Sequence, residues 1–254
     1  MALRLTGDHA SAMVNIVSFT FSPLLTEFHV IVAQRKPFPQ IRDMLGGYSR
    51  VLVAGCGTCV AVCLAGGEKE AGILASQLML SAAGEKREFR ASAAAVERQC
   101  DREFLQLFHE KVAEADAVIS LACWAGIQFL AEMYPQVPVF PGVDTTFIGV
   151  AEEAGVWTER CRSCSQCYLG ITGGICPVTM CSKGLLNGPC GGTVHGKCEV
   201  DLERDCAWTQ IYRRLEEQSR TDIQAMPVLP MKHNLRIQPG RVIHSAYRKR
   251  FSIG

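Results

Sequence analysis

The chain has 254 residues, 48% of them hydrophobic, and a formal net charge of +1. Its length allows one large domain or two modest ones, and its balanced charge gives no nucleic-acid or polyanion signature. No apolar run reaches the roughly 18 to 20 residues needed to cross a bilayer, so we expect no membrane span.

The N-terminal segment differs from the rest of the chain. Residues 1–29 show weak periodicity and are expected to form a poorly ordered extension. Alternatively, translation starts at Val30, which the intact mass of the native protein would test. Three further parts are predicted: an α/β domain over 30–150, a cysteine-rich module over 151–220 and a basic tail over 221–254.

Strands and helices alternate through residues 30–150. Helices are predicted over 40–47, 68–83, 96–115 and 126–134, and strands over 50–54, 87–92, 117–121 and 137–140. This alternation predicts an α/β fold, with a small parallel doubly wound sheet and helices on both faces.

The C-terminal half is expected to contain little regular structure. Residues 141–160 are predicted to be a connection, in which Trp157 either packs the next module against the sheet or lies buried in a surface linker. Residues 208–218 have apolar residues at helical spacing and are predicted to close the module. The basic tail after Asp222 is expected to be solvated, or to dock on an acidic partner.

The chain has thirteen cysteines. The number is odd, the start lacks an ordered signal peptide, and tight spacings such as C-x2-C-x2-C suit shared metal ligation better than a disulfide framework. We therefore expect metal-binding thiols in a reducing cytoplasm, with disulfides as the alternative.

Five cysteines are expected near one edge of the predicted sheet. Cys56, Cys59 and Cys63 follow the first parallel strand, Cys123 follows the third, and Cys100 lies early in the predicted helix 96–115. Ligands of open α/β sheets bind beyond the carboxyl ends of the strands. Three thiols from one loop and one from another would form a four-thiolate site. Cys123 is preferred to Cys100 as the fourth ligand because it directly follows a strand.

The loop that contains Cys56 and Cys59 has other interpretations. A dinucleotide loop is disfavoured because the third glycine is missing and no acid ends the second strand. The spacing also differs from the C-x3-C-x2-C of radical-SAM sites, and three incidental core thiols are a further alternative. Gly66-Gly67 predicts a close backbone approach before the next helix.

Residues 161–206 contain eight cysteines. The first four have the spacing C-x2-C-x2-C-x8-C-P, close to a ferredoxin-type [4Fe-4S] sequence except for the long gap. The others could form a second four-thiolate set. Zinc is the alternative metal, free thiols are a third possibility, and His195 is expected to be an exposed loop residue rather than a ligand. The two predicted sets are Cys161, Cys164, Cys167 and Cys176, and Cys181, Cys190, Cys198 and Cys206.

Longer sequence runs resemble a known family. TGGICPVTMCSKGLLNGPCGG, GKCEV and CAWTQIYRRL resemble the cysteine-rich C-terminal module of methylenetetrahydrofolate reductases. VLVAGCGTCVAVCLAGGEKE and LACWAGIQFLAE resemble the N-terminal part of the MetV-like small subunit of these enzymes. The resemblance covers residues 30–218.

The resemblance implies a small iron–sulfur partner of a flavin-containing TIM-barrel subunit that reduces methylenetetrahydrofolate to methyltetrahydrofolate. One to three [4Fe-4S] clusters would pass electrons to that flavin, and an upstream donor complex would supply them. The resemblance also implies zinc in the C-terminal module. No folate-binding acid, flavin phosphate loop or nucleophile–base pair is evident, so we expect no catalysis by this chain alone.

Three functions therefore remain open. The first is an iron–sulfur electron-transfer subunit of a methylenetetrahydrofolate reductase. The second is a zinc-stabilised structural or activating subunit of the same complex without redox turnover. The third is an independent enzyme that acts on a small molecule at the sheet edge.

Overall fold

The structure is a computed structural model that describes residues 31–153, 155–164 and 167–222. The predicted N-terminal extension, the alternative start at Val30 and the predicted basic tail beyond residue 222 lie outside these residues. Within the described residues, no helix is both long and apolar enough to cross a membrane.

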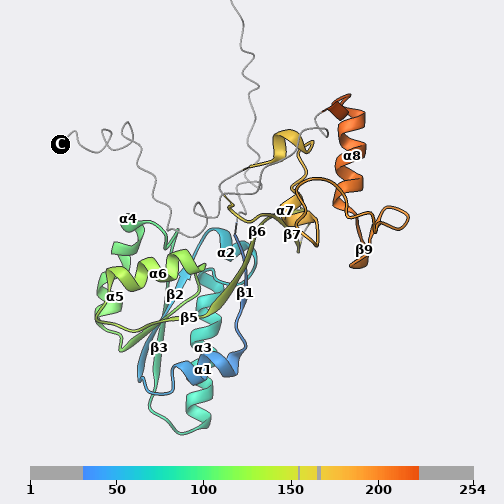
Figure 1. Cartoon of the computed structure of the whole chain (residues 1–254). Coiled ribbons are helices and arrows are strands. Elements are labelled where there is room, and N and C mark those ends of the chain that lie inside the picture. Colours follow the sequence, from blue (N-terminus) through green and yellow to red (C-terminus); the bar gives the residue numbers. More distant parts are fainter. Residues whose placement is uncertain (1–30, 154, 165–166, 223–254) are drawn as a thin grey trace, which may run out of the picture.

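A parallel sheet forms the centre of the N-terminal half (Figure 1). Its strand order is β3-β2-β4-β5, and all three pairings are parallel. The chain therefore leaves β2 for β3 on one side and returns to β4 on the other. This confirms the predicted α/β class with a parallel sheet. The strands are β2 (Arg50–Cys56), β3 (Arg90–Val96), β4 (Ala117–Ser120) and β5 (Val139–Pro141).

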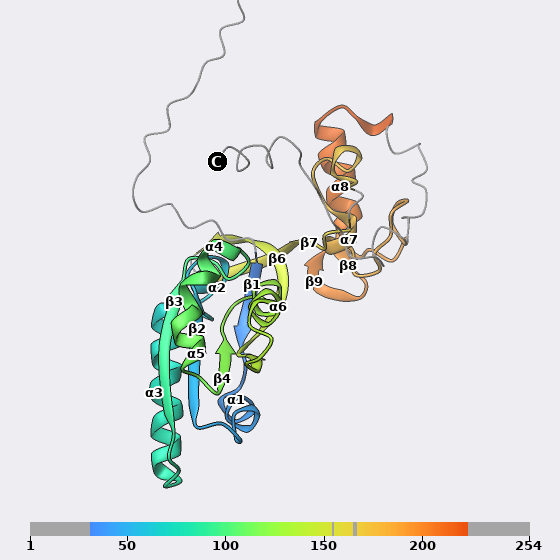
Figure 2. The same cartoon turned by 90° about the vertical axis from the view of Figure 1, so that its left-hand side faces the viewer.

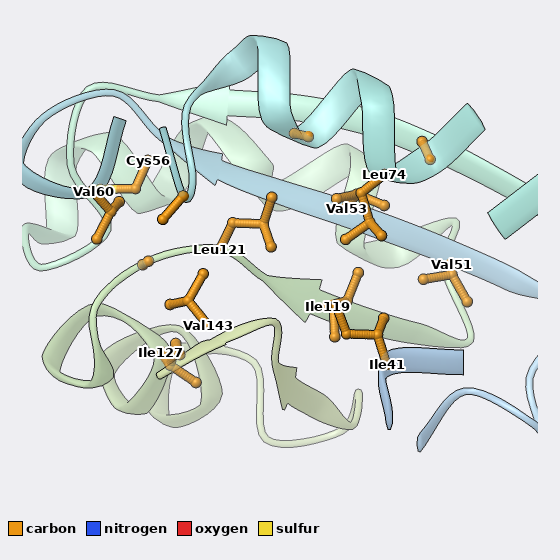
Figure 3. Packing of buried hydrophobic residues seen from close by; sticks show 14 of the residues in the cluster. Ile41, Val51, Val53, Cys56, Val60, Leu74, Ile119, Leu121, Ile127 and Val143 are labelled. Carbon is orange, nitrogen blue, oxygen red and sulfur yellow. The ribbon is translucent and has the colours of Figure 1, made fainter. Parts of the chain in front are cut away.

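The sheet is covered on both faces because its central strand is apolar on both faces. Successive side chains of a strand point to opposite faces, so Val51 and Val53 join one buried cluster and Leu52 and Ala54 join another. Figure 3 shows Val53 packed near Leu74 of helix α3, with Val51 further along the strand in the same cluster. The first cluster contains residues of α1 (Phe38–Met44) and α3 (Glu68–Gly84), and the second contains residues of α4 (Arg102–Leu105), α5 (His109–Ala113) and α6 (Trp124–Met133).

The predicted helix over 96–115 is wrong in its first part. Val96 is the last residue of β3, and the helical segment begins only at Arg102, after the Asp101 carboxylate accepts a hydrogen bond from the Glu103 backbone N–H at 3.2 Å. Side-chain capping of this kind defines a helix start. A 3₁₀ turn, η1 (Gln106–Phe108), separates α4 from α5. Cys100 consequently lies in a turn between β3 and α4, not in a helix.

The predicted connection over 141–160 is also wrong, because it consists mainly of two strands. An antiparallel sheet of order β1-β6-β7 contains them, and β6 runs across the expected domain boundary between residues 150 and 151. In Figures 1 and 2, β6 and β7 lead from the parallel sheet to the C-terminal part of the chain. Trp157 is half-buried in β7. The strands are β1 (Ile31–Arg35), β6 (Val143–Glu153) and β7 (Val156–Cys161).

The cysteine-rich C-terminal part contains short elements and one longer helix. Helix α8 (Ala207–Glu217) buries Ala207, Ile211 and Leu215, and the Trp208 indole N–H donates to the Leu185 carbonyl at 2.9 Å. The helix therefore closes this part of the chain, as its periodicity predicted. Tyr212 lies on its exposed side. The short elements of this part are η2 (Leu169–Ile171), α7 (Pro177–Met180), β8 (Lys197–Cys198) and β9 (Asp201–Asp205). One further short helix, α2 (Cys59–Val62), lies in the N-terminal half.

Candidate metal centres

The first candidate centre lies at the switch point of the parallel sheet. The chain crosses from one side of β2 to the other here, and the loops after β2 and β4 meet beyond the strand ends. Such a crevice is the usual ligand site of an open α/β sheet. Cys56 ends β2, Cys59 begins α2, and Cys123 immediately precedes α6.

Two glycines allow the loops at this edge to approach closely. The Cys56 backbone N–H donates to the Gly66 carbonyl at 2.7 Å, which folds the loop back on its own start. A side chain at Gly66 would collide with the Leu121 backbone carbonyl at the end of β4. The close approach predicted for Gly66-Gly67 is therefore present, and it brings the loop after β2 against the loop after β4.

Three other sheet-edge thiols lie within electrostatic reach of Cys100. Burial raises the pKa of the Cys100 thiol, and the neighbouring thiols of Cys123, Cys56 and Cys59 raise it further. Burial likewise raises the pKa of Cys56, with a smaller contribution from Cys123. Desolvation and like charge both disfavour the thiolate. A cation at this position would reverse both effects.

Cys63 is placed differently from the other four. Its Sγ donates to the Cys59 carbonyl at 3.4 Å and to the Ile31 carbonyl of β1 at 3.8 Å. Burial raises its pKa, and Cys59 is the only other thiol that contributes. The structure thus brings Cys56, Cys59, Cys100 and Cys123 together and turns the Cys63 thiol toward β1.

The dinucleotide interpretation of the loop fails for a different reason than the sequence indicated. Strand β3 ends at Val96 and Glu97 follows it, so an acid does stand at the strand end. However, the Glu70 carboxylate of α3 accepts the Gly67 backbone N–H at 2.9 Å. This carboxylate occupies the helix N-terminus, where a pyrophosphate would have to bind.

The second candidate centre begins where β7 ends. Cys161 is the last residue of β7, and Cys176 directly precedes Pro177 at the start of α7. The Thr179 hydroxyl lies 3.4 Å from the Arg160 carbonyl, so it ties α7 to the end of β7. Beside Cys161, the Ser163 backbone N–H points at the Cys161 sulfur at 3.3 Å. Cys164 and Cys167 border residues 165–166, which lie outside the described part.

The other four cysteines of the module line one hollow. Cys181, Cys190, Cys198 and Cys206 face it together with residues that include Lys183, Glu199 and Trp208. Their convergence agrees with the predicted second set. His195 lies outside this hollow, is exposed and has a φ of 50° in a turn, in agreement with the predicted loop role.

Hydrogen bonds favour the thiolate form of two cysteines in this hollow. The Ser182 hydroxyl, 3.5 Å from the Cys198 sulfur, lowers the pKa of Cys198. Burial alone would raise the pKa of Cys206, but hydrogen bonds from Thr209, Trp208 and Thr193 together outweigh it and lower the pKa. Thiolates are the metal-binding form of cysteine.

The donor chemistry at both places fits thiolate-bound metal. Cys56, Cys59, Cys63, Cys100 and Cys123 carry free thiols, as do Cys181, Cys190, Cys198 and Cys206. Nevertheless, no group of three or more histidine, cysteine or acidic side chains in the described part is arranged to hold a metal ion. The thiolate donors suit zinc or an iron–sulfur cluster, and the side chains define neither metal nor coordination geometry.

Comparison with known proteins gives one relationship. No curated protein and no solved structure matches the chain. The segment from residue 140 to residue 234, which contains β6, β7 and the whole cysteine-rich module, matches the family model described as "Methylene-tetrahydrofolate reductase C terminal". This match relates the C-terminal part of the chain to the methylenetetrahydrofolate reductases.

Proposed function

We propose that this chain is an iron–sulfur electron-transfer subunit that supports a flavin-containing methylenetetrahydrofolate reductase. The observation that carries the proposal is the coincidence of a reductase-related C-terminal segment with a second group of thiols at the switch point of the sheet. A purely structural metal in the C-terminal module would leave the sheet-edge thiols without a role.

The sheet-edge thiols have the features of a redox site. Cys56 and Cys123 are only 6% and 8% exposed, and they project from loops tied to rigid strand ends. A [4Fe-4S] cluster bound there would take up and release single electrons. The chain's own residues would bind the cluster, limit its contact with water and hold it in a fixed position.

The reaction on the folate would belong to the partner. In the described part no aspartate, glutamate, histidine or lysine is buried, and these are the side chains most often used for proton transfer. The flavin-containing catalytic subunit, the upstream electron donor and a cytoplasmic location are accordingly parts of the proposal.

A second candidate function is a zinc-stabilised structural or activating subunit of the same complex. It is favoured by the four cysteines that share one hollow, two of them with lowered pKa. Four thiolates around one ion are typical of structural zinc sites. The two proposals are compatible if zinc binds in the C-terminal module and a cluster binds at the sheet edge.

Metal analysis of the full chain, purified without oxygen, tests both proposals. We expect iron and acid-labile sulfide, with or without zinc, and an electron paramagnetic resonance signal after reduction. Zinc with no iron would reject electron transfer and leave the structural role.

Two matched variants then separate the two regions. Cys59→Ser is expected to remove the iron at the sheet edge and to leave the metal of the C-terminal module. Cys164→Ser is expected to affect only the C-terminal module. If Cys59→Ser leaves the iron content unchanged, the cluster at the sheet edge is wrong.

A further inference from the structure

We infer that the ligands at the sheet edge are Cys56, Cys59, Cys100 and Cys123, with Cys63 excluded, and that buried Gln99 positions them. This inference rests on the proposed iron–sulfur function. It changes the ligand set expected from the sequence, which contained Cys63 and took Cys100 only as the alternative to Cys123. It also assigns a role to a fully buried polar side chain near the site.

Gln99 connects the ends of two neighbouring strands. Its amide N–H groups donate to the carbonyls of Ala54 and Gly55 in β2, at 2.9 and 3.0 Å. Its side-chain oxygen accepts the Ser120 hydroxyl at the end of β4, at 2.7 Å. The Ser120 oxygen in turn lies 3.3 Å from the Ala122 backbone N–H, next to Cys123. This network leaves no buried polar atom of Gln99 without a partner.

The network joins the three chain segments that carry three of the proposed ligands. Gln99 itself belongs to the turn after β3 and immediately precedes Cys100. Its side chain is bonded to Gly55, the residue directly before Cys56 in β2. Moving Gln99 would therefore move Cys100 relative to both Cys56 and Cys123.

The surrounding packing is built around this glutamine. Gln99 is 0% exposed, and Ser120 is equally buried. Helix α6 approaches through Gly126, where a Cβ would lie 3.0 Å from the Gln99 Cβ and 2.9 Å from the Ala122 Cβ. A buried polar network in an apolar core is retained only when its partners are all satisfied, and it then fixes one arrangement of the chain.

Cys63 lacks these connections. Its sulfur lies 3.4 Å from the Cys59 carbonyl, within the same short helix region, and 3.8 Å from the Ile31 carbonyl of β1. Cys100, by contrast, directly follows Gln99, whose side chain is bonded to Gly55 beside Cys56 and, through Ser120, to Ala122 beside Cys123. A cubane gives each thiolate its own iron, so the four ligands must surround a shared volume rather than one ion. Cys100 meets this requirement and Cys63 does not.

The ligand set is tested with a matched pair of variants in the full chain, Cys100→Ala and Cys63→Ala. After anaerobic purification, Cys100→Ala is expected to lower iron by one to about four atoms per chain, through a three-iron form or complete loss. Cys63→Ala is expected to keep the wild-type iron, sulfide and electron paramagnetic resonance spectrum. Circular dichroism and the melting temperature check that both variants fold.

The opposite result would overturn the ligand set without overturning the proposed function. Loss of iron in Cys63→Ala, with retention in Cys100→Ala, would restore the set expected from the sequence. If neither Cys56→Ala nor Cys123→Ala lowers the iron content, the cluster itself is absent from this edge and the proposed function fails there.

The positioning role is tested with Gln99→Met, which keeps the length of the side chain and removes its hydrogen bonds. Loss of such an outer contact typically weakens metal binding by about 10- to 100-fold. We therefore expect faster iron loss to a chelator and a shifted midpoint potential. Gln106→Met, an exposed position in η1, is the control and is expected to match wild type.

Ser120→Ala tests the positioning role of Gln99 if Gln99→Met does not fold. It removes one bond of the network and is expected to accelerate iron loss in the same direction by a smaller factor. A wild-type potential and wild-type iron retention in a folded Gln99→Met or Ser120→Ala protein would reject the positioning role.

Discussion

The two groups of thiols are held in place by different physical means. At the sheet edge, Cys56 and Cys123 belong to a buried cluster that continues through the strands into α3. In the C-terminal module, Cys190 is exposed, and its sulfur donates to the Glu199 carboxylate at 3.1 Å. Apolar burial contributes about 25 cal/mol per Å², so buried apolar surface stabilises the framework of the first group. The segment 181–206 has little such surface, and we expect the second group to depend on a bound metal.

The largest expected effect tests this difference directly. Removing bound metal from the full chain is expected to unfold the segment 181–206 and to leave the parallel sheet folded. Structural zinc contributes roughly 10 to 16 kcal/mol to the folding of small modules, whereas this segment has almost no buried apolar side chain in the described part.

Amide hydrogen exchange with and without a chelator measures this effect. The amides of 181–206 should lose their protection, and those of β2 and β4 should keep it. Equal protection of the module in both states would show that its fold does not depend on metal, and the contrast between the two regions would disappear.

An intermediate effect is expected from Gly66→Ala, which challenges the framework at the sheet edge. The added methyl group would collide with the Leu121 carbonyl. Overpacking of this kind lowers the free energy of unfolding by about 1 to 3 kcal/mol. We expect a lower melting temperature and less iron at the sheet edge, with unchanged metal in the C-terminal module.

Gly72→Ala provides the control for this substitution. Gly72 lies within α3, and no atom within 4 Å would meet its added Cβ. Replacing glycine by alanine inside a helix raises the stability of the folded protein by roughly 0.5 to 1 kcal/mol. If Gly66→Ala were as stable as Gly72→Ala, close approach of the two loops would not be required.

The smallest expected effect concerns the opposite end of the sheet. The Arg50 guanidinium donates to the Asp116 carboxylate at 2.5 Å, and this hydrogen bond holds the pKa of Asp116 below its usual value. A carboxylate with a lowered pKa in the folded state stabilises the folded protein at pH values above its unfolded pKa of about 3.9. This contribution is lost as the pH falls through the folded pKa.

Thermal melts of wild type and Asp116→Asn, from neutral pH to a pH below the folded pKa of Asp116, measure this contribution. The variant should melt at a slightly lower temperature at neutral pH, and the two curves should converge in acid because wild-type Asp116 is then protonated. Iron and zinc contents should remain unchanged, which would separate framework stability from metal binding. A difference that persists in acid would contradict this explanation.

Much of the parallel sheet could be predicted because its central strands are short apolar runs. Strand β2 and helix α3 lie close to their predicted bounds, and Cys56 and Cys123 lie at or just after the ends of β2 and β4. The small side chains of β3, with Ala93, Ala94 and Ala95 before Val96, suit a helix equally well. Pairing with β2 selected the strand, which moved Cys100 into a turn.

The antiparallel strands and the role of Gln99 could not be predicted from local patterns. Strand β6 ends in exposed Glu152 and Glu153, so its second half has no buried face to reveal it. Gln99 acquires its role only from Ala54 and Ser120, which are 45 and 21 residues away in the chain. Its neighbours in the sequence contain no sign of these contacts.

The β1–β6–β7 ladder sets a fixed interval between the two thiol regions. Ile148 of β6 is paired with Ile31 on one side and with Cys161 on the other. The Ile31 carbonyl accepts the Cys63 thiol, whereas Cys161 is the first cysteine of the module. Two strand spacings separate these backbones, roughly 10 Å. Hydrogen-bonded strands keep this spacing, so the backbones of Ile31 and Cys161 stay at one separation. A partner that contacts both strands therefore meets them at that separation.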